Sequence, residues 1–92
     1  MKREAAETLA LDVLGWIAAE QDLLARFMNA SGTRAGDLAA RAGDADFLAA
    51  VMDFLMSEDA WARRYGEARA IAPETLQAAR AALPGGALPH WT

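Results

Sequence analysis

The sequence predicts an all-α protein, a compact bundle of five to six short helices around a central apolar helix at about residues 45–56. Two observations support this prediction. Alanine, leucine and methionine recur at helical spacing from residue 4 to residue 83, and only residues that begin or end helices break the pattern. The 92 residues, 54% of them hydrophobic, also suffice for one core. We therefore expect a single helical domain at residues 1–86 and a short C-terminal tail at residues 87–92.

The first predicted helix covers residues 4–20, where an apolar face opposes a polar stripe. Its apolar residues are Ala6, Leu9, Ala10, Val13 and Ile17, flanked by Leu11, Leu14 and Ala18. Asp22 is expected to begin a second helix that ends at Gly32, because glycine tolerates the left-handed backbone of a helix terminus. A short third helix follows Thr33 and carries Leu38.

The fourth predicted segment, Phe47 to Met56, is apolar almost all round and is interrupted only by Asp53. A helix with this pattern belongs in the centre of a bundle, because an exposed apolar surface of that size would promote aggregation. Asp44 is expected to cap its N-terminus.

The two remaining helices are predicted from their first residues. Ser57 is expected to cap a helix at about residues 58–70, because a serine hydroxyl accepts hydrogen bonds from the first backbone amides. Glu58 and Asp59 come next, and their negative charges are favourable at the positive end of the helix dipole. One face of this helix carries Trp61, Arg64, Tyr65 and Ala68. Pro73 begins the last helix, since proline is favoured in a first turn, and the Pro-Gly-Gly run at residues 84–86 ends it.

A displacement of 38 residues reveals a weak internal repeat in the sequence. It aligns Glu20 with Glu58, Arg26 with Arg64, Phe27 with Tyr65, Ala30 with Ala68, Leu38 with Leu76 and Ala40 with Ala78. The repeat predicts two helix-turn-helix-like units on either side of the central helix. An ancestral duplication and two uses of one packing solution both account for it.

Three segments carry a family resemblance: AETLALDVLGWIA (residues 6–18), DADFLAAVMDFLMSEDAW (44–61) and IAPETLQAARAALPGG (71–86). Through them the chain resembles a small alphaproteobacterial family described as a domain of unknown function. The resemblance spans nearly the whole chain and implies an all-helical bacterial protein, with no activity, ligand or catalytic residue to carry over. The family pattern has a proline early in the third helix, where this chain has Ala35 and Gly36. The sequence therefore does not fix the residue at which that helix begins.

The charge of the chain is acidic and unevenly distributed. The net charge of −4 and the pI near 4.8 oppose binding to a phosphate backbone in general. Residues 1–60 carry five basic and eleven acidic side chains, whereas residues 61–92 carry four basic and two acidic ones. This asymmetry predicts a polarised surface.

The termini and the cysteine content bear on localisation. The absence of cysteine is compatible with a reducing or an oxidising compartment. The chain begins Met1-Lys2-Arg3, but acidic residues follow at once, and a signal peptide needs an uninterrupted apolar stretch there. No stretch reaches the ~18 apolar residues of a membrane span. We expect a cytoplasmic protein with no membrane association.

Few side chains of this sequence can perform chemistry. A zinc site lacks ligands, since there is no cysteine and the single histidine, His90, lies in the tail. Asp44 and Asp46 resemble the start of a calcium loop, but the chain continues into an apolar helix without the glycine that such a loop needs. We expect no metal, no cofactor and no enzymatic activity.

The remaining function is binding, and the sequence favours a protein–protein interaction or adaptor module with an unidentified protein partner. The candidate interaction surface is Arg63, Arg64, Arg69, Arg80 and Trp91. Trp91 has two interpretations, either packing back onto the bundle or docking into a partner, because tryptophan is common at binding hot spots. Self-association as a homodimer through Met28, Met52 and Met56 is a further prediction, provided that these side chains are exposed.

The alternative function is DNA binding by a helix-turn-helix regulator. Residues 31–42 suit the turn and second helix of that motif, with Leu38 inward and Arg34 and Arg41 outward, and similar geometry recurs at residues 71–82. Phosphate contacts need many basic groups, and these segments offer few, which disfavours nucleic acid. The alternative therefore depends on the arginines after residue 60 forming one face.

Overall fold

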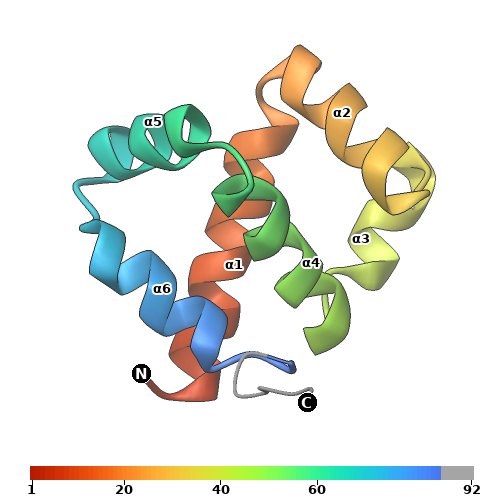
Figure 1. Cartoon of the computed structure of the whole chain (residues 1–92). Coiled ribbons are helices and arrows are strands. Elements are labelled where there is room, and N and C mark those ends of the chain that lie inside the picture. The colour runs from red at the N-terminus through yellow and green to blue at the C-terminus, as the bar shows by residue number, and fades with distance from the viewer. Residues whose placement is uncertain (86–92) are drawn as a thin grey trace.

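The computed structural model describes residues 1–85, in which the chain forms six α-helices, one 3-10 turn and no strand (Figure 1). The elements are α1 (Arg3–Ala18), α2 (Gln21–Ser31), η1 (Ala35–Asp37), α3 (Leu38–Arg41), α4 (Ala45–Met56), α5 (Asp59–Arg69) and α6 (Pro73–Ala81). The all-α prediction is confirmed. The predicted tail, with His90 and Trp91, lies outside the described residues.

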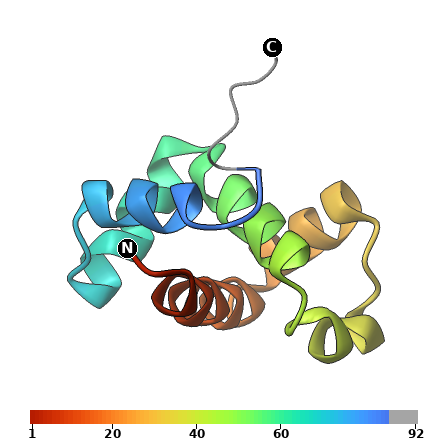
Figure 2. The same ribbon diagram turned by 90° about the horizontal axis from the view of Figure 1, so that it is seen from below.

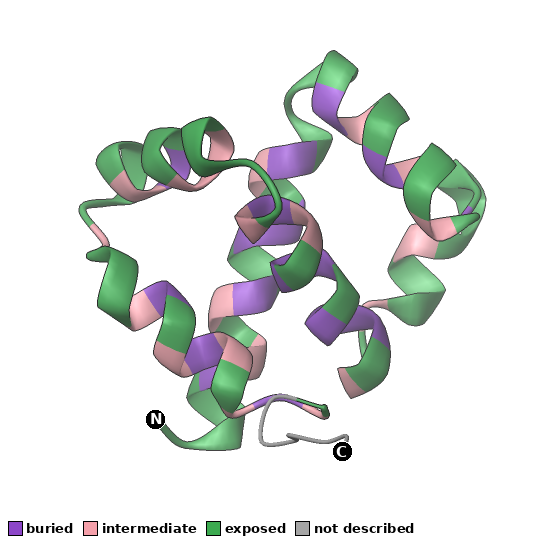
Figure 3. Cartoon of the chain, in the orientation of Figure 1, coloured by how far each residue is buried: buried purple, intermediate pink, exposed green. Residues whose placement is uncertain are grey.

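The core lies where α1 and α4 pack against each other. Val13 and Ile17 of α1 and Val51 and Leu55 of α4 are completely buried, so the apolar stripe of each helix faces the other. The buried positions lie mainly on these two helices, and α2 and α6 add further ones (Figure 3). Seen from below, α1 lies on one side of the molecule and α4 and α6 on the other (Figure 2). The predicted central position of α4 is confirmed, and α1 shares it.

Local sequence signals explain most helix ends. The Asp44 carboxylate accepts a 3.0 Å hydrogen bond from the Asp46 amide, which confirms the predicted cap of α4. Gly32 ends α2 with a φ of 73°, in the left-handed region where glycine carries no steric penalty. Pro73 occupies the first turn of α6, where its missing N–H has no intrahelical acceptor to lose.

The predicted capping role of Ser57 is wrong. Its backbone is still helical, so its hydroxyl points back and donates a 2.7 Å hydrogen bond to the Phe54 carbonyl. Ser57 therefore ends α4, and the extended residue Glu58 stands at the N-cap of α5. Leu11, which flanks the apolar face of α1, is 43% exposed.

The third predicted helix is shorter and less regular than its neighbours. It begins as the 3-10 turn η1 and continues for only four residues as α3. Thr33, which is buried, receives a 2.9 Å hydrogen bond from the Arg41 guanidinium on its hydroxyl, and that guanidinium also lies over the Phe47 ring. The irregular start lies at Ala35 and Gly36, where the sequence left the beginning of this helix open.

The 38-residue repeat is present in the backbone. We call residues 20–41 the first unit and residues 58–81 the second unit. Glu20 and Glu58 are both extended N-caps, and Gly32 and Ala70 both adopt the left-handed conformation that ends the first helix of each unit. The first unit contains α2, η1 and α3, and the second contains α5 and α6 (Figure 1). The weak sequence repeat therefore corresponds to two first helices of 11 residues that begin and end in the same backbone conformation, whereas the second helices differ in length.

Candidate functional site

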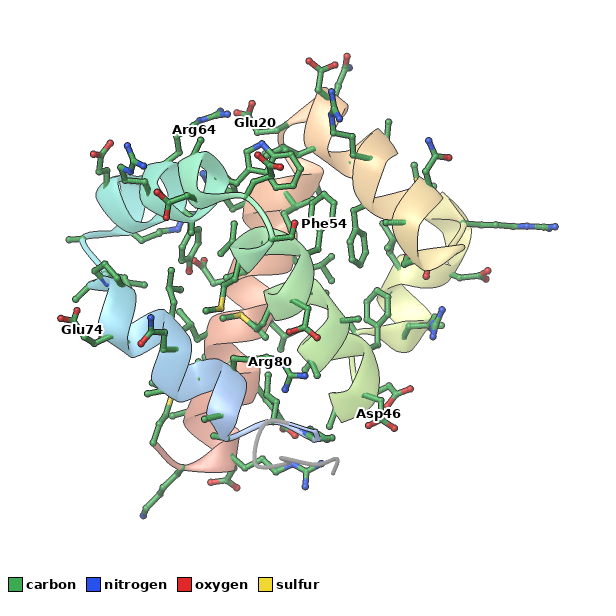
Figure 4. All side chains as sticks on the ribbon, viewed as in Figure 1. Glu20, Asp46, Phe54, Arg64, Glu74 and Arg80 are labelled. Carbon is green, nitrogen blue, oxygen red and sulfur yellow. The ribbon has the colours of Figure 1, made fainter. Side chains whose placement is uncertain are left out.

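Of the four arginines of the predicted interaction surface, three lie on α5 and Arg80 lies on α6, and each pairs with a carboxylate. The pairs are Arg63–Asp59, Arg64–Glu20, Arg69–Asp12 and Arg80–Asp53. Arg64 meets Glu20 at the top of α1, whereas Arg80 reaches from α6 to α4 (Figure 4). Within residues 1–85 these side chains form no single basic face, and Trp91 lies outside that range.

All four pairs join an arginine after residue 60 to a carboxylate before it. Arg64, Arg69 and Arg80 bind carboxylates outside their own helix, whereas Arg63 and Asp59 both lie on α5. The charge asymmetry of the sequence is therefore largely satisfied within the molecule, between α5 or α6 and the helices that precede them.

The contact between α1 and α5 depends on the ends of long side chains. The Tyr65 hydroxyl donates a 2.6 Å hydrogen bond to Asp12 Oδ2, and Arg69 Nε donates to the same oxygen at 2.8 Å. Tyr65 meets Trp16 edge to face, with ring centroids 5.6 Å apart, and Arg64 lies over the Trp16 ring. Tyr65 is buried and Trp16 half-buried, as their periodicity predicts. This face anchors α5.

The electrostatics of this anchor do not suit proton transfer. The hydrogen bond from Tyr65, together with the Arg69 guanidinium, lowers the pKa of Asp12 below its ordinary value, although partial burial opposes the shift. Burial and the hydrogen bond to Asp12 raise the pKa of Tyr65 well above its ordinary value of 10.0. Asp12 therefore stays ionised and Tyr65 stays protonated near neutral pH, so the pair is a structural bridge.

An adjacent face of α5 borders a groove of about 360 Å³ between α5 and α6. The groove is lined by Asp59, Ala62, Arg63, Gly66, Glu67, Ala70, Ile71, Ala72, Pro73 and Leu76. Its floor is apolar, and the charged side chains come from one edge of α5. This volume lies at the lower end of the range typical of binding sites.

Two backbone features shape this groove. A Cβ atom at Gly66 would lie 2.8 Å from the Ile71 carbonyl oxygen, so only glycine permits the close approach of the chain after α5. Ala70, with a φ of 56°, turns the chain sharply toward α6 in a conformation that glycine usually adopts. Sequence reasoning missed the groove, although the small residues at positions 62, 66 and 70, four apart on one helix face, are a signal for it.

The two helix-turn-helix-like units present few free basic groups that could contact DNA phosphates. The second helix of the first unit, α3, has four residues, and Arg41 is already bound to Thr33 and stacked on Phe47. In the second unit the Arg80 guanidinium binds the Asp53 carboxylate and also donates to the Pro84 carbonyl. Arg41 and Arg80 are therefore engaged within the described part of the chain, whereas Arg34 forms no ion pair with a residue in the range 1–85.

The methionines predicted to mediate self-association are mostly buried. Met52 is completely buried and Met28 and Met56 are half-buried, so the three methionines do not form an exposed set. Among residues 1–85, no cluster of three or more potential metal ligands occurs. None of the helices in that range combines the length and the apolar character needed to cross a membrane.

Comparison with known proteins identifies the family of this chain. No curated protein and no solved structure matches the chain. A family model described as a protein of unknown function matches residues 3–86, which cover all six helices and the groove. The chain therefore belongs to the DUF3572 family.

Proposed function

We propose that this protein is a non-enzymatic module that binds another protein through the α5–α6 groove. The observation that carries the proposal is the groove itself, an apolar floor of about 360 Å³ beside a charged edge. Its lining contains no serine, cysteine, histidine or lysine, and its charged residues are Asp59, Arg63 and Glu67. Such a lining offers no hydroxyl or thiol nucleophile and supports the burial of apolar groups.

The position of the groove also supports this role. The face of α5 that carries Tyr65 is occupied by contacts with α1, whereas the face that carries Ala62 and Gly66 borders the groove. A partner can therefore bury apolar surface on α5 without displacing the contacts that hold the helix in place.

The test compares two leucine substitutions on the same helix. Ala62 lines the groove, so Ala62→Leu fills it, whereas Ala68 is exposed outside the groove and Ala68→Leu is the matched control. The tagged native protein and both variants are used to purify partners from a lysate of the source organism, after circular dichroism has shown that all three are folded. We expect a stoichiometric protein that the native chain and Ala68→Leu retain and Ala62→Leu loses.

The same purification separates this proposal from DNA binding. It is repeated after nuclease treatment and at two salt concentrations, with bound nucleic acid identified as well as bound protein. Equal retention of the partner by Ala62→Leu contradicts the groove as the binding site. Recovery of DNA that is released steeply with salt would instead favour the helix-turn-helix function.

A further inference from the structure

A second groove, of about 290 Å³, lies between α2 and α4. Its lining includes Phe27, Ala30, Ala50, Asp53, Phe54 and Ser57, and Asp53 is the only charged residue of the lining. The α2–α4 groove shares no lining residue with the α5–α6 groove. The two grooves can therefore have different occupants.

Aromatic rings form part of the wall of the α2–α4 groove. Phe54 meets Phe27 edge to face, with ring centroids 5.3 Å apart, and stacks on Trp61 with centroids 4.9 Å apart. Phe27 is buried, whereas Phe54 remains half-buried despite these two contacts. Phe54 therefore keeps apolar surface that a further aromatic side chain can cover.

Residues 84 and 85 lie beside this groove. Arg80 donates hydrogen bonds to both carboxylate oxygens of Asp53, at 2.6 and 3.1 Å, and a third of 3.0 Å to the Pro84 carbonyl. A Cβ atom at Gly85 would lie 3.5 Å from the same guanidinium. Because Asp53 lines the groove, Arg80 holds this part of the chain at the edge of the groove.

The sequence after Gly85 carries two large apolar side chains within reach of the groove. Residues 86–92 read Gly-Ala-Leu-Pro-His-Trp-Thr, so Trp91 comes six positions after Gly85. An extended chain spans roughly 3.3–3.6 Å per residue, which allows Trp91 to lie up to about 20 Å from Gly85. Along α4 the groove extends from Ala50 to Ser57, or about 10 Å. The tether is therefore long enough for Trp91 to reach any part of the groove.

We infer that residues 86–92 dock in the α2–α4 groove of their own chain, with Trp91 against Phe54 and Phe27. Because the segment is tethered at Gly85, its docking does not lose the translational freedom that a separate partner would lose. The docked segment covers the apolar surface of Phe54, and Trp91 becomes part of the fold instead of an exposed anchor for a partner. This inference is independent of the proposed function, which concerns the α5–α6 groove.

The test is NMR spectroscopy of the full chain with assigned alanine methyl groups. We expect nuclear Overhauser effects between the indole ring of Trp91 and the methyl groups of Ala30 and Ala50. Trp91→Ala should abolish them, shift the amide resonances of Ala30 and Ala50, and lower Tm by roughly 4–8 °C. Thr92→Ala is the matched control and should leave these resonances and Tm unchanged.

A second pair of variants changes the groove and keeps the segment intact. Ala50→Asp places a charge in the lining, whereas Ala25→Asp places one at an exposed position of α2 outside the groove. The contacts of Trp91 should be lost in Ala50→Asp and kept in Ala25→Asp, because an apolar ring does not pack against an unpaired carboxylate. Ala30→Asp takes the place of Ala50→Asp if the latter does not fold.

Three outcomes overturn the inference. The first is the absence of effects between Trp91 and the methyl groups of Ala30 and Ala50. The second is contact of Trp91 with residues of the α5–α6 groove. The third is tested with a mixture of isotope-labelled and unlabelled chains, in which effects between different copies would show that the segment docks on a second molecule.

Discussion

The hydroxyl of Tyr65 donates a 2.6 Å hydrogen bond to the carboxylate of Asp12, which lies 53 residues earlier in the chain. The ring of Tyr65 is completely buried, and the polar atom at its tip reaches an ionised acceptor at the edge of α1. Arg69 donates to the same carboxylate oxygen, so Asp12 joins two successive turns of α5 to α1. This bridge fixes the helix that forms one wall of the groove.

Removing the hydroxyl tests the energetic value of this bridge. Tyr65→Phe keeps the buried ring and its contact with Trp16 but leaves Asp12 with Arg69 alone. We expect a loss of about 1–2 kcal/mol in the free energy of unfolding, since the acceptor is charged, and a fall in Tm of roughly 4–8 °C per kcal/mol. Thermal and urea unfolding measure both quantities, and an unchanged Tm would show that the bridge contributes nothing.

The raised pKa of Tyr65 predicts the alkaline behaviour of the protein. The folded state keeps the phenolic proton, whereas the unfolded chain loses it near pH 10, so stability is fully present below pH 10 and falls as the pH rises above it. The slope for one proton is about 1.4 kcal/mol per pH unit.

Tyr65 is the single tyrosine of the chain, so phenolate absorbance reports on this residue alone. We expect the absorbance to rise well above pH 10 and together with the loss of helical circular dichroism. Ionisation with a midpoint near 10 in a protein that is still folded would contradict the assigned environment.

The left-handed residue between α5 and α6 is a site of backbone strain. Ala70 has a φ of 56°, which its Cβ disfavours, so Ala70→Gly should stabilise the protein by about 1 kcal/mol. Chemical denaturation measures the change. A destabilised variant would mean that contacts of the Ala70 methyl group outweigh the strain.

The equivalent residue of the first unit provides the reciprocal control. Gly32 has a φ of 73° with open space around the position of a Cβ atom, so steric contacts do not complicate the substitution. Gly32→Ala should destabilise by about 1 kcal/mol, opposite in sign to Ala70→Gly. Equal signs for the two substitutions would show that the two turns are not equivalent.

The core prediction is tested in the central helix. Val51 is completely buried between α4 and α1, and no charged partner is available there, so Val51→Asp should cost at least about 3 kcal/mol and remove most of the folded population. Ala50→Asp, at the adjacent exposed position, is the control and should remain folded. Circular dichroism and the dispersion of the proton NMR spectrum measure the outcome, and a folded Val51→Asp variant would contradict the assigned core.

Several features of the fold were predictable because they depend on neighbours in the sequence. The cap at Asp44, the turn at Gly32 and the start at Pro73 act within one helical turn, and the buried stripe of α4 follows from its period. Ser57 shows the limit of this reasoning. Its hydroxyl can either cap α5 or donate a hydrogen bond to a carbonyl of the preceding turn. Because the backbone of Ser57 is helical, the hydroxyl donates to the Phe54 carbonyl.

The candidate site depends on how the helices pack against one another, which the spacing of residues along the chain does not fix. The excess of arginine after residue 60 predicted a polarised surface, but the packing of α5 and α6 brings Arg64, Arg69 and Arg80 against acidic residues of earlier helices. The groove likewise exists only because α6 returns beside α5 after the turn at Ala70.

The sequence by itself determined the helical class, the order of the helices and the repeat of 38 residues, since periodicity and capping are short-range properties of the chain. Tertiary structure alone decided which charges are neutralised and which face of α5 remains open. Ion pairing and groove formation require residues such as Asp12 and Arg69, 57 positions apart, to meet, and their distance in space is set by helix packing rather than by their spacing in the chain.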